Sequence, residues 1–474
     1  MKPILYFLVL LLTLSRNING QKISVAPELD VRNDDMFALI GNIDNKILTF
    51  RSNDRKYILN IFDRNLNRYT TRPLTFEKKK IKIVSISNNK DSWVLVYSYL
   101  DKKKEIVNAY RYDNIGNRID SNQIFITKRD ILNRKFRFTE SEDEKQLLLF
   151  RKKDNSSMLF IRINVDSLTK TYSKLIAFED IKISTDFRKV LISNKGVFYT
   201  IFEKIPSIFS KSKHKIIVNS FNNELEEYKT ININLDFKTN KFKSKYDNIN
   251  EILNIAGTTT KSYSDKSVGY YIFKLNRNLE LLTKIINKYK AGFLKDFYRL
   301  RNKKPKKYIN NFYIKEILFR NDGGTILVFE KKEIISRQNN IRRNRSFRSN
   351  TDYLFEELGL ISIHEDGQYF WHKIIPKYQF SSNDYGLYSS VFIFKTPSLL
   401  KLIFNDEIKD QNQIMMYSVN PLGKTDRRSI FSTELYDLNL AFEKSLQISG
   451  NKLIVPSYKN DRLKLVMIEF YTKP

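Results

Sequence analysis

The chain has 474 residues, of which 41% are hydrophobic and 13% aromatic, a formal net charge of +31, and no cysteine. This share of large apolar side chains excludes an intrinsically disordered chain, and the lack of cysteine excludes disulfides, thiol nucleophiles and cysteine-bound zinc. Ile, Phe, Tyr, Val and Leu supply most of the apolar mass while Ala occurs only seven times, so the composition favours an all-β protein.

The N-terminus has the order of regions of a secretory signal peptide. Lys2 precedes an apolar run over residues 4–14, which is too short to span a bilayer, and polar residues and Gly20 follow. We expect residues 1–20 to be a signal peptide cleaved between Gly20 and Gln21; the alternative is a buried first strand. No later run of 18 or more apolar residues occurs, so we expect a mature chain without a transmembrane segment, exported to the periplasm or the cell exterior.

A strand followed by a polar corner recurs along the mature chain at intervals of 50 to 58 residues, with one interval of 88. Six of the seven corners begin with Asp or Asn, whose side chains accept hydrogen bonds from backbone amides two residues on and so hold a turn. Turn chemistry therefore explains the corners, and they imply no catalysis. The corners begin at Asp63, Asp113, Asn164, Asn222, Asn276, His364 and Asn420.

Each corner lies within a unit of four short predicted strands. In the second unit the strands are predicted over residues 81–86, 93–99, 105–112 and 122–128. Four short strands in a repeat of this length predict a β-propeller of four-stranded antiparallel blades. A string of β-sandwich domains is the alternative, but it requires units of about 100 residues and linkers between them.

The seven corners mark seven blades, and the tail after them adds three strands without a fourth. The mature N-terminus, residues 21–29, is an extended segment with no partner of its own. It can pair into the last blade and close the fold without disulfides. We therefore expect eight blades, with seven as the alternative.

The units resemble β-propeller repeats in general and lack repeated Trp-Asp, kelch-type Gly-Gly and Asp-box motifs. Hairpins such as residues 319–329, "FRNDGGTILVF", resemble the units of TolB-like propellers. The sequence "NINGQ" at residues 17–21, together with a composition rich in Lys, Asn and Ile, resembles exported proteins of Bacteroidota. These resemblances imply a propeller, residues 21–474, and export, and they assign no site residues.

Four long segments are expected on one face of the propeller: residues 204–214, 258–267, 287–310 and 331–352. Long loops on a rigid scaffold are where binding usually occurs, and two of these segments, 287–310 and 331–352, are strongly basic insertions. An amphipathic helix is predicted over residues 290–301, with an apolar side formed by Phe293, Leu294, Phe297 and Tyr298. Lys and Arg in these insertions can bind phosphate, sulfate or carboxylate groups; the alternative is that they are simply solvated. The candidate polyanion-binding residues are Lys303, Lys304, Lys306, Lys307, Arg342, Arg343, Arg345 and Arg348.

The sequence offers little for metal or general-base chemistry. His364 and His372 flank one corner beside Glu365 and Asp366, but Asp366-Gly367 is an ordinary turn and we predict no metal site. His214 lies in a basic segment and is expected to be solvated. No phosphate-binding glycine loop and no Ser/His/Asp order occur, so no cofactor is expected.

We therefore expect an exported, non-enzymatic β-propeller that binds a partner through its long-loop face. The partner would be a protein, an anionic glycan or another polyanion at the cell envelope. The alternative is a carbohydrate-active hydrolase or lyase with acidic residues in the propeller channel, although the predicted innermost strands contain few acids. A third interpretation is a scaffold whose charge reflects composition alone.

Overall fold

A computed structural model describes residues 21–53, 56–89, 91–129, 134–206, 213–222, 227–261, 264–338, 349–408 and 411–471. The predicted signal peptide, residues 1–20, lies outside the described residues. Within them, no helix is long and apolar enough to cross a membrane.

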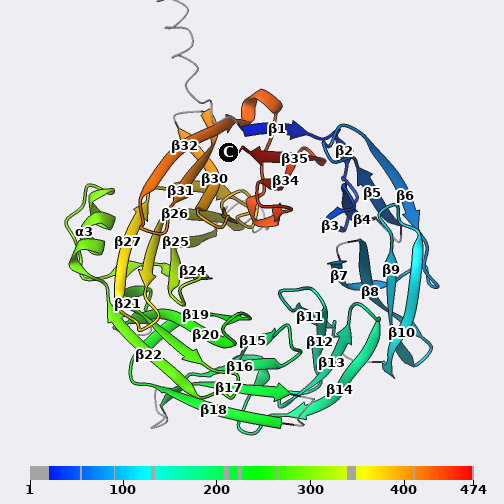
Figure 1. Ribbon diagram of the computed structural model, residues 1–474, viewed down its shortest axis with the longest axis horizontal. Coiled ribbons are helices and arrows are strands. Elements are labelled where there is room, and N and C mark those ends of the chain that lie inside the picture. The colour runs from blue at the N-terminus through cyan, green and yellow to red at the C-terminus, as the bar shows by residue number, and fades with distance from the viewer. Residues whose placement is uncertain are drawn as a thin grey trace, which may run out of the picture. The chain divides into compact units, whose positions relative to one another are not determined.

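The described strands form eight antiparallel sheets, as in an eight-bladed β-propeller (Figure 1), and in seven of them the four main strands follow one another in chain order. Blade 1 consists of β3 (Met36–Ile43), β4 (Lys46–Asn53), β5 (Lys56–Phe62) and β6 (Tyr69–Leu74). Blade 2 consists of β7 (Lys82–Asn89), β8 (Ser92–Asp101), β9 (Lys104–Tyr112) and β10 (Arg118–Lys128). Blade 3 consists of β11 (Arg137–Glu140), β12 (Gln146–Lys152), β13 (Ser157–Asn164) and β14 (Thr169–Ala177). Blade 4 consists of β15 (Phe187–Ile192), β16 (Phe198–Lys204), β17 (His214–Asn222) and β18 (Glu227–Leu235).

Three of the remaining blades, blades 5, 6 and 8, have an extra short strand. Blade 5 consists of β19 (Lys238–Asp247), β20 (Ile252–Thr260), β21 (Lys266–Leu275) and β22 (Leu281–Lys288), with β23 (Ile309–Asn310) paired to β21. Blade 6 consists of β24 (Phe312–Phe319), β25 (Thr325–Gln338), β26 (Ser349–Ile363) and β27 (Tyr369–Ile375), with β28 (Gln379–Ser382) paired to β26. Blade 7 consists of β29 (Val391–Lys395), β30 (Leu400–Ile408), β31 (Gln411–Val419) and β32 (Thr425–Ser432).

The eighth blade joins both ends of the chain, as predicted. It consists of β33 (Leu446–Gln447), β34 (Lys452–Lys459), β35 (Arg462–Phe470) and β1 (Gln21–Val25), and β2 (Leu29–Asp30) also pairs with β35. The register of β1 runs from Gln21 opposite Phe470 to Val25 opposite Val466. The short helices are α2 (Ile183–Asp186), α3 (Ala291–Arg299), η1 (Thr433–Tyr436) and η2 (Phe442–Lys444).

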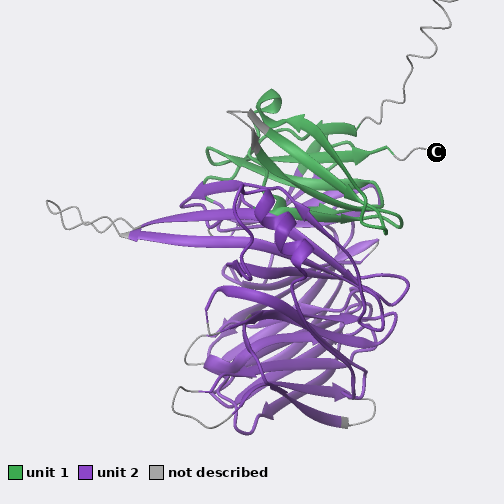
Figure 2. Cartoon of the chain, turned by 90° about the vertical axis from the view of Figure 1, so that its left-hand side faces the viewer, with its two compact units in different colours: residues 1–33, 62–70, 390–474 green, residues 34–61, 71–389 purple. Residues whose placement is uncertain are grey.

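The described residues fall into two compact units, coloured separately in Figure 2. One unit contains blades 7 and 8, the N-terminal strands and residues 62–70. The other contains residues 34–61 and 71–389, and therefore blades 2 to 6 and most of blade 1. In this larger unit the first strand of each blade lies innermost (Figure 1), and first strands of consecutive blades contact one another. The prediction that residues 21–474 form a single domain stays a prediction.

The corners between the third and fourth strands are held as the sequence predicts. The Oδ1 atom of Asp63 accepts hydrogen bonds from the amides of Asn65 (3.0 Å) and Asn67 (2.9 Å). The same bonds, to amides two and four residues on, form at Asp113, Asn276 and Asn420. The repeat seen in the sequence is therefore a repeat of side-chain-capped turns.

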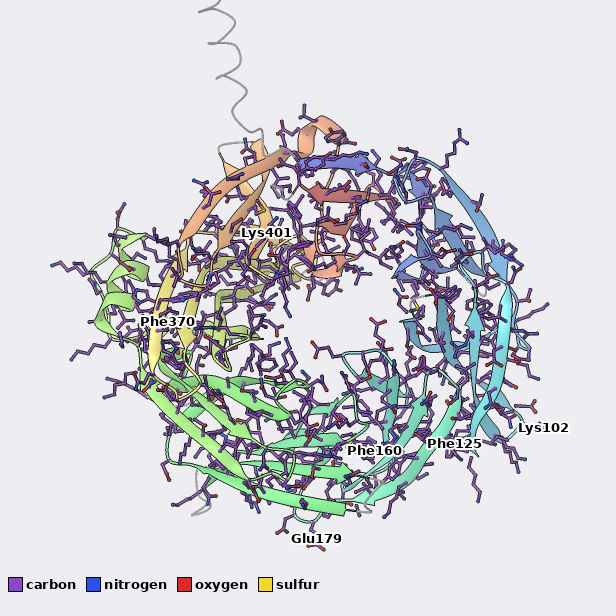
Figure 3. All side chains as sticks on the ribbon, viewed as in Figure 1. Lys102, Phe125, Phe160, Glu179, Phe370 and Lys401 are labelled. Atoms are coloured by element: carbon purple, nitrogen blue, oxygen red, sulfur yellow. The ribbon has the colours of Figure 1, made fainter. Side chains whose placement is uncertain are left out.

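Large aromatic side chains fill the space between neighbouring blades. Phe160 of blade 3, labelled in Figure 3, is fully buried and lies 5.1 Å from the ring of Phe198 and 6.2 Å from that of Phe221, both in blade 4. Such contacts explain why the middle strands are almost continuously apolar, because both of their faces are covered.

Candidate anion-binding surface

The connection between blades 5 and 6 contains the predicted helix, now seen as α3. Phe293 and Phe297 are fully buried, and their rings lie 6.2 Å and 5.6 Å from that of Phe312 on β24. Tyr289 stacks on Phe293 at 5.2 Å, and Leu294 packs at the edge of the same cluster. The spacing of these apolar residues places them on one side of the helix, so α3 docks on blade 6 and leaves its charged side outward.

Residues 300–308, here called the basic strap, leave this helix and are fixed at both ends. The amides of Arg301 and Lys303 both donate to the carbonyl of Tyr298 at 3.1 Å, and the Tyr298 hydroxyl donates to the carbonyl of Tyr308. Directly after the strap, β23 pairs with β21. The strap is therefore a short segment held against folded structure at each end, and Pro305 lies within it, beyond the helix as predicted.

Arg301 anchors the strap to the base of the β25–β26 hairpin. Its Nε atom donates to Glu357 Oε1 at 2.7 Å, and its Nη2 atom pairs with Glu356. Both glutamates are almost completely buried, and Lys331 pairs with Glu356 from the opposite strand. A bulge in the β25–β26 pairing, between the Glu330 and Lys332 pairs, places Lys331 opposite the two glutamates. These two buried glutamates are therefore paired with Arg301 and Lys331 and have a structural role.

Four candidate lysines lie on the strap and point to solvent. Lys303, Lys304, Lys306 and Lys307 are exposed, and none of the carboxylates in the described part of the chain forms an ion pair with them. The Nζ atom of Lys306 lies 5.8 Å from the ring centre of Tyr308. The strap thus presents uncompensated positive charge on a fixed backbone.

The positive potential at the strap also affects a buried neighbour. Burial lowers the pKa of Lys331 to about 8, repulsion from Arg301 and from Lys303 adds to the shift, and Glu357 and Glu333 oppose it. Lys331 thus lies among charges of both signs, and Lys303 is the strap residue that acts on it.

The second basic segment, residues 331–352, is not the loop that the sequence suggests. Strands β25 and β26 continue through it as a hairpin that pairs from Lys332 opposite Phe355 to Gln338 opposite Ser349. Figure 2 shows this hairpin as the pair of purple strands that reaches furthest to the left. The polar sequence of the segment hides the strands, because their stabilisation comes from pairing with each other and with β28. Four candidate residues, Arg342, Arg343, Arg345 and Arg348, lie outside the described residues.

Two of the other long segments agree only in part with the prediction. Strand β16 ends at Lys204 and β17 begins at His214, as the predicted segment requires, and residues 207–212 between them lie outside the described residues. Residues 258–260 continue β20 and residues 266–267 begin β21, so the predicted loop over 258–267 shrinks to 261–265. Antiparallel pairing places the described ends of β16, β20, β22 and β25, from which the four long segments leave, at the same ends of their blades, which we call the insertion face.

Two of the three histidines, His214 and His372, contact carboxylates on other elements of the fold. His214 is buried at the start of β17, where its Nε2 atom lies 3.0 Å from Glu203 Oε1, so the expectation that it is solvated is wrong. His372 reaches from β27 to Asp296 on α3, with 3.1 Å between Nε2 and Oδ2, and it pairs in register with Ile361 rather than His364. No group of three or more potential metal ligands occurs among the described residues.

The first strands of blades 3 to 6 carry few acids, and each has a partner. Glu316 pairs with Lys245 at 3.2 Å, and Asp247 accepts hydrogen bonds within its own turn. Glu140 accepts a hydrogen bond from Ser87, and burial raises its pKa, with Glu144 nearby adding to the rise. Lysines are more frequent on these strands, as in "KFKSKYD" at residues 241–247.

Sequence reasoning missed the buried glutamates and the lysines of the first strands. The doublet Glu356-Glu357 inside the apolar sequence "DYLFEELGLI" and the alternating lysines of residues 241–247 were signals that could have revealed them. Charges that recur inside strands require partners, and the partner of Glu356, Arg301, lies 55 residues away in the chain.

No protein-family model matches the sequence, and no curated protein matches it. Among solved structures, the chain is similar to Sqt1 of Chaetomium thermophilum, with 8% identity, 95% of this chain and 98% of that chain covered, and a TM-score of 0.43. It is similar to the WD40 domain of SCAP from fission yeast, with 10% identity, 95% and 94% covered, and a TM-score of 0.41. It is also similar to the polysaccharide lyase Uly1, with 8% identity, 94% and 99% covered, and a TM-score of 0.40.

Proposed function

We propose that this protein is an exported binding protein that holds an anionic polymer on the insertion face of blade 6. The observation that supports this most directly is the basic strap, where four exposed lysines without described carboxylate partners are carried on a backbone anchored by Arg301 to Glu356 and Glu357. A fixed row of ammonium groups binds phosphate, sulfate or carboxylate groups in series and releases their counterions. An acidic surface on a partner protein would use the same residues.

The test is binding of residues 21–474 to a sulfated polysaccharide, a polyuronate and DNA across a salt series. A strap variant changes Lys303, Lys304, Lys306 and Lys307 to Ser. We expect it to bind more weakly and to lower the slope of log K against log salt by about three, close to 0.7–0.9 for each charge contact that is lost. A hairpin variant, with Arg342, Arg343, Arg345 and Arg348 changed to Ser, measures the contribution of the tip.

A matched control removes the same charge elsewhere. Lys103, Lys153, Lys174 and Lys182 are exposed and lie on blades 2 and 3 and the connection to blade 4, and the control variant changes all four to Ser. If the control loses as much affinity as the strap variant, binding follows net charge and the strap is not the site. Comparison of the three polymers shows which anionic group is preferred, and a failure of all three to bind would refute the proposal.

The alternative function, hydrolysis or cleavage of a carbohydrate, is favoured by one observation. Glu140 on β11 and Glu144 in the following turn both have raised pKa values: burial disfavours the charged form of Glu140, and partial desolvation together with repulsion from Asp143 disfavours that of the exposed Glu144. A carboxyl group with a raised pKa is suited to act as a general acid. Release of new reducing or unsaturated ends from an acidic polysaccharide, lost in Glu140→Gln, would support this function in place of simple binding.

A further inference from the structure

Three lysines from two blades come together away from the basic strap. Lys189 lies on β15, the first strand of blade 4, and Lys243 and Lys245 lie on β19, the first strand of blade 5. The Nζ atom of Lys189 donates to the carbonyl oxygen of Ser244 at 2.9 Å. This carbonyl lies between Lys243 and Lys245 in the chain, so the ammonium group of Lys189 meets the backbone of β19 at the point where Lys243 and Lys245 are attached.

The cluster has more positive than negative charge. Lys245 pairs with Glu316 at 3.2 Å and also donates to the carbonyl of Ile317 at 3.1 Å. In the described part of the chain, no carboxylate forms an ion pair with Lys189 or Lys243. Three ammonium groups therefore share one carboxylate.

Lys189 is an exposed residue, but its ammonium group is partly desolvated where it meets β19. This desolvation lowers its pKa, repulsion from Lys243 and Lys245 lowers it further, and Glu316 opposes the shift. These are the charged groups that act on Lys189 from its neighbouring strands. An anion placed among the three lysines would supply the missing negative charge.

We propose that Lys189, Lys243 and Lys245 form a binding site for a single oxyanion group, such as a sulfate, phosphate or carboxylate. Ammonium groups on long side chains are point charges that adapt to a tetrahedral or a planar anion. A neutral ligand would leave the charge of the cluster uncompensated and is not expected to bind. The site differs from the basic strap in its residues and in its place in the fold, since it lies on first strands and not on a connection.

The test measures the reactivity of individual lysines in the full mature chain. Trace acetylation followed by peptide mass spectrometry gives a rate for each lysine, in sodium chloride and in sodium sulfate at equal ionic strength. At about 10 mM sulfate, roughly tenfold above a millimolar dissociation constant, we expect the rates of Lys189 and Lys243 to fall several-fold. The exposed lysines Lys174 and Lys182 should not change. Equal protection of all four lysines, or protection of none, would overturn the proposal.

Three single substitutions are expected to weaken, leave unchanged or strengthen the sulfate protection of Lys189. A general loss of folding would not produce this pattern. Lys243→Gln should abolish the sulfate protection of Lys189, whereas Lys241→Gln, on the same strand but against the ring of Tyr313, should leave it intact. Glu316→Gln removes the carboxylate of the cluster and should strengthen protection. Weaker protection in Glu316→Gln, or equal loss in both lysine variants, would contradict an anion site.

A last comparison identifies the source of the anionic group. A sulfated oligosaccharide is tested on the wild-type protein and on the strap variant, in parallel with free sulfate. Protection of Lys189 by the oligosaccharide that requires the strap means that the group belongs to a polymer bound at both places. Protection by free sulfate in both proteins means that the site binds a free anion. Protection of Lys189 by free sulfate is measured separately from the affinity of the strap for a polymer. The oxyanion site and the polymer site can therefore each be refuted without the other.

Discussion

Some buried charges of this protein pair across blades, and Arg151 and Glu105 form one such pair. Arg151 on β12 lies 2.5 Å from Glu105 on β9, and both side chains are almost completely buried. Ser98 donates a further hydrogen bond to Glu105 at 3.1 Å, and the guanidinium of Arg151 lies 4.1 Å from the ring centre of Phe136. An ion pair of this kind adds little net stability compared with apolar residues, but loss of one partner leaves a buried charge.

The Glu105–Arg151 pair gives a prediction about stability. Arg151→Met should lower the free energy of unfolding by about 3–5 kcal/mol, because Glu105 stays buried without its partner. The double variant Arg151→Met/Glu105→Leu should recover most of the loss. Denaturant unfolding of the wild type, both single variants and the double variant measures the coupling. A double variant as unstable as Arg151→Met alone would show that packing of the arginine, and not the charge, is what matters.

Glu140 gives a prediction about pH. Its pKa is raised in the folded protein by burial, so between its ordinary pKa and the raised one the folded state binds more protons than the unfolded chain. The free energy of unfolding then falls as pH rises through that interval. Glu140→Gln stays neutral, so it should lose this part of the pH dependence and be more stable than the wild type above the interval.

Urea unfolding from about pH 4 to pH 7 checks this prediction, with Glu179→Gln as the control. Glu179 is exposed and is labelled at the lower edge of Figure 3. A wild-type pH profile that Glu140→Gln leaves unchanged would refute the role of Glu140.

Individual residues also show why parts of the site could not be predicted. His214 stands next to a basic segment in the sequence, which suggests solvent, but it is the first residue of β17 and faces Glu203 on β16. The exposure of the strap lysines was predictable, because an exposed run of charge needs no distant partner, and their role as a site stays a prediction. Arg301, Glu356 and Glu357 act together only through tertiary contacts, which local composition does not reveal.

Turns and helices that are specified by local sequence signals were predictable from the sequence. The Asp and Asn corners and α3 were predicted because side-chain capping and apolar spacing are local signals. The outer part of the β25–β26 hairpin was not, since its strands contain few apolar residues and are stabilised by their mutual pairing and by β28. A polar segment between strands reads as a loop unless its partner is known.

Gly359 on β26 links the packing of α3 to the position of the basic strap. A Cβ atom at this position would lie 2.7 Å from Phe312 and 2.9 Å from Phe293, which is closer than carbon atoms approach. Gly359→Ala should therefore displace α3, lower stability by about 1–3 kcal/mol and weaken polymer binding, although no lysine changes.

Gly450→Ala is the matched control, because nothing lies within 4 Å of the Cβ that it would add. Its stability should stay within about 0.5 kcal/mol of the wild type. Thermal unfolding and the polymer-binding assay measure both variants. If Gly359→Ala binds polymer with unchanged affinity while losing stability, the strap does not depend on the docking of α3.

At the scale of the whole molecule, the number of blades was predicted from the C-terminal segment, which has three predicted strands where a blade needs four. Seven corners and three further strands left one strand missing, and the extended N-terminal segment could supply it. Eight sheets and the pairing of β1 with β35 confirm eight blades over the alternative of seven. The division of the described residues into two compact units has no counterpart in composition, because it depends on which strands contact one another.

The closing strand gives the last prediction. Strand β1 covers the edge of β35, and Ile23 and Val25 pack against the apolar cluster of blades 7 and 8, while Leu29 pairs with Leu463.

Deletion of residues 21–30 would leave the backbone groups of β35 without partners at an exposed edge, which destabilises a sheet and promotes aggregation. We expect faster hydrogen exchange in β29–β35, with exchange in blades 3 to 5 nearly unchanged. A synthetic peptide of residues 21–30 added in trans should restore slow exchange, whereas a peptide with Ile23 and Val25 changed to Asp should not. Equal acceleration in all blades would mean that the closing strand stabilises the entire fold and not one unit, and no acceleration would mean that blade 8 is stable with three strands.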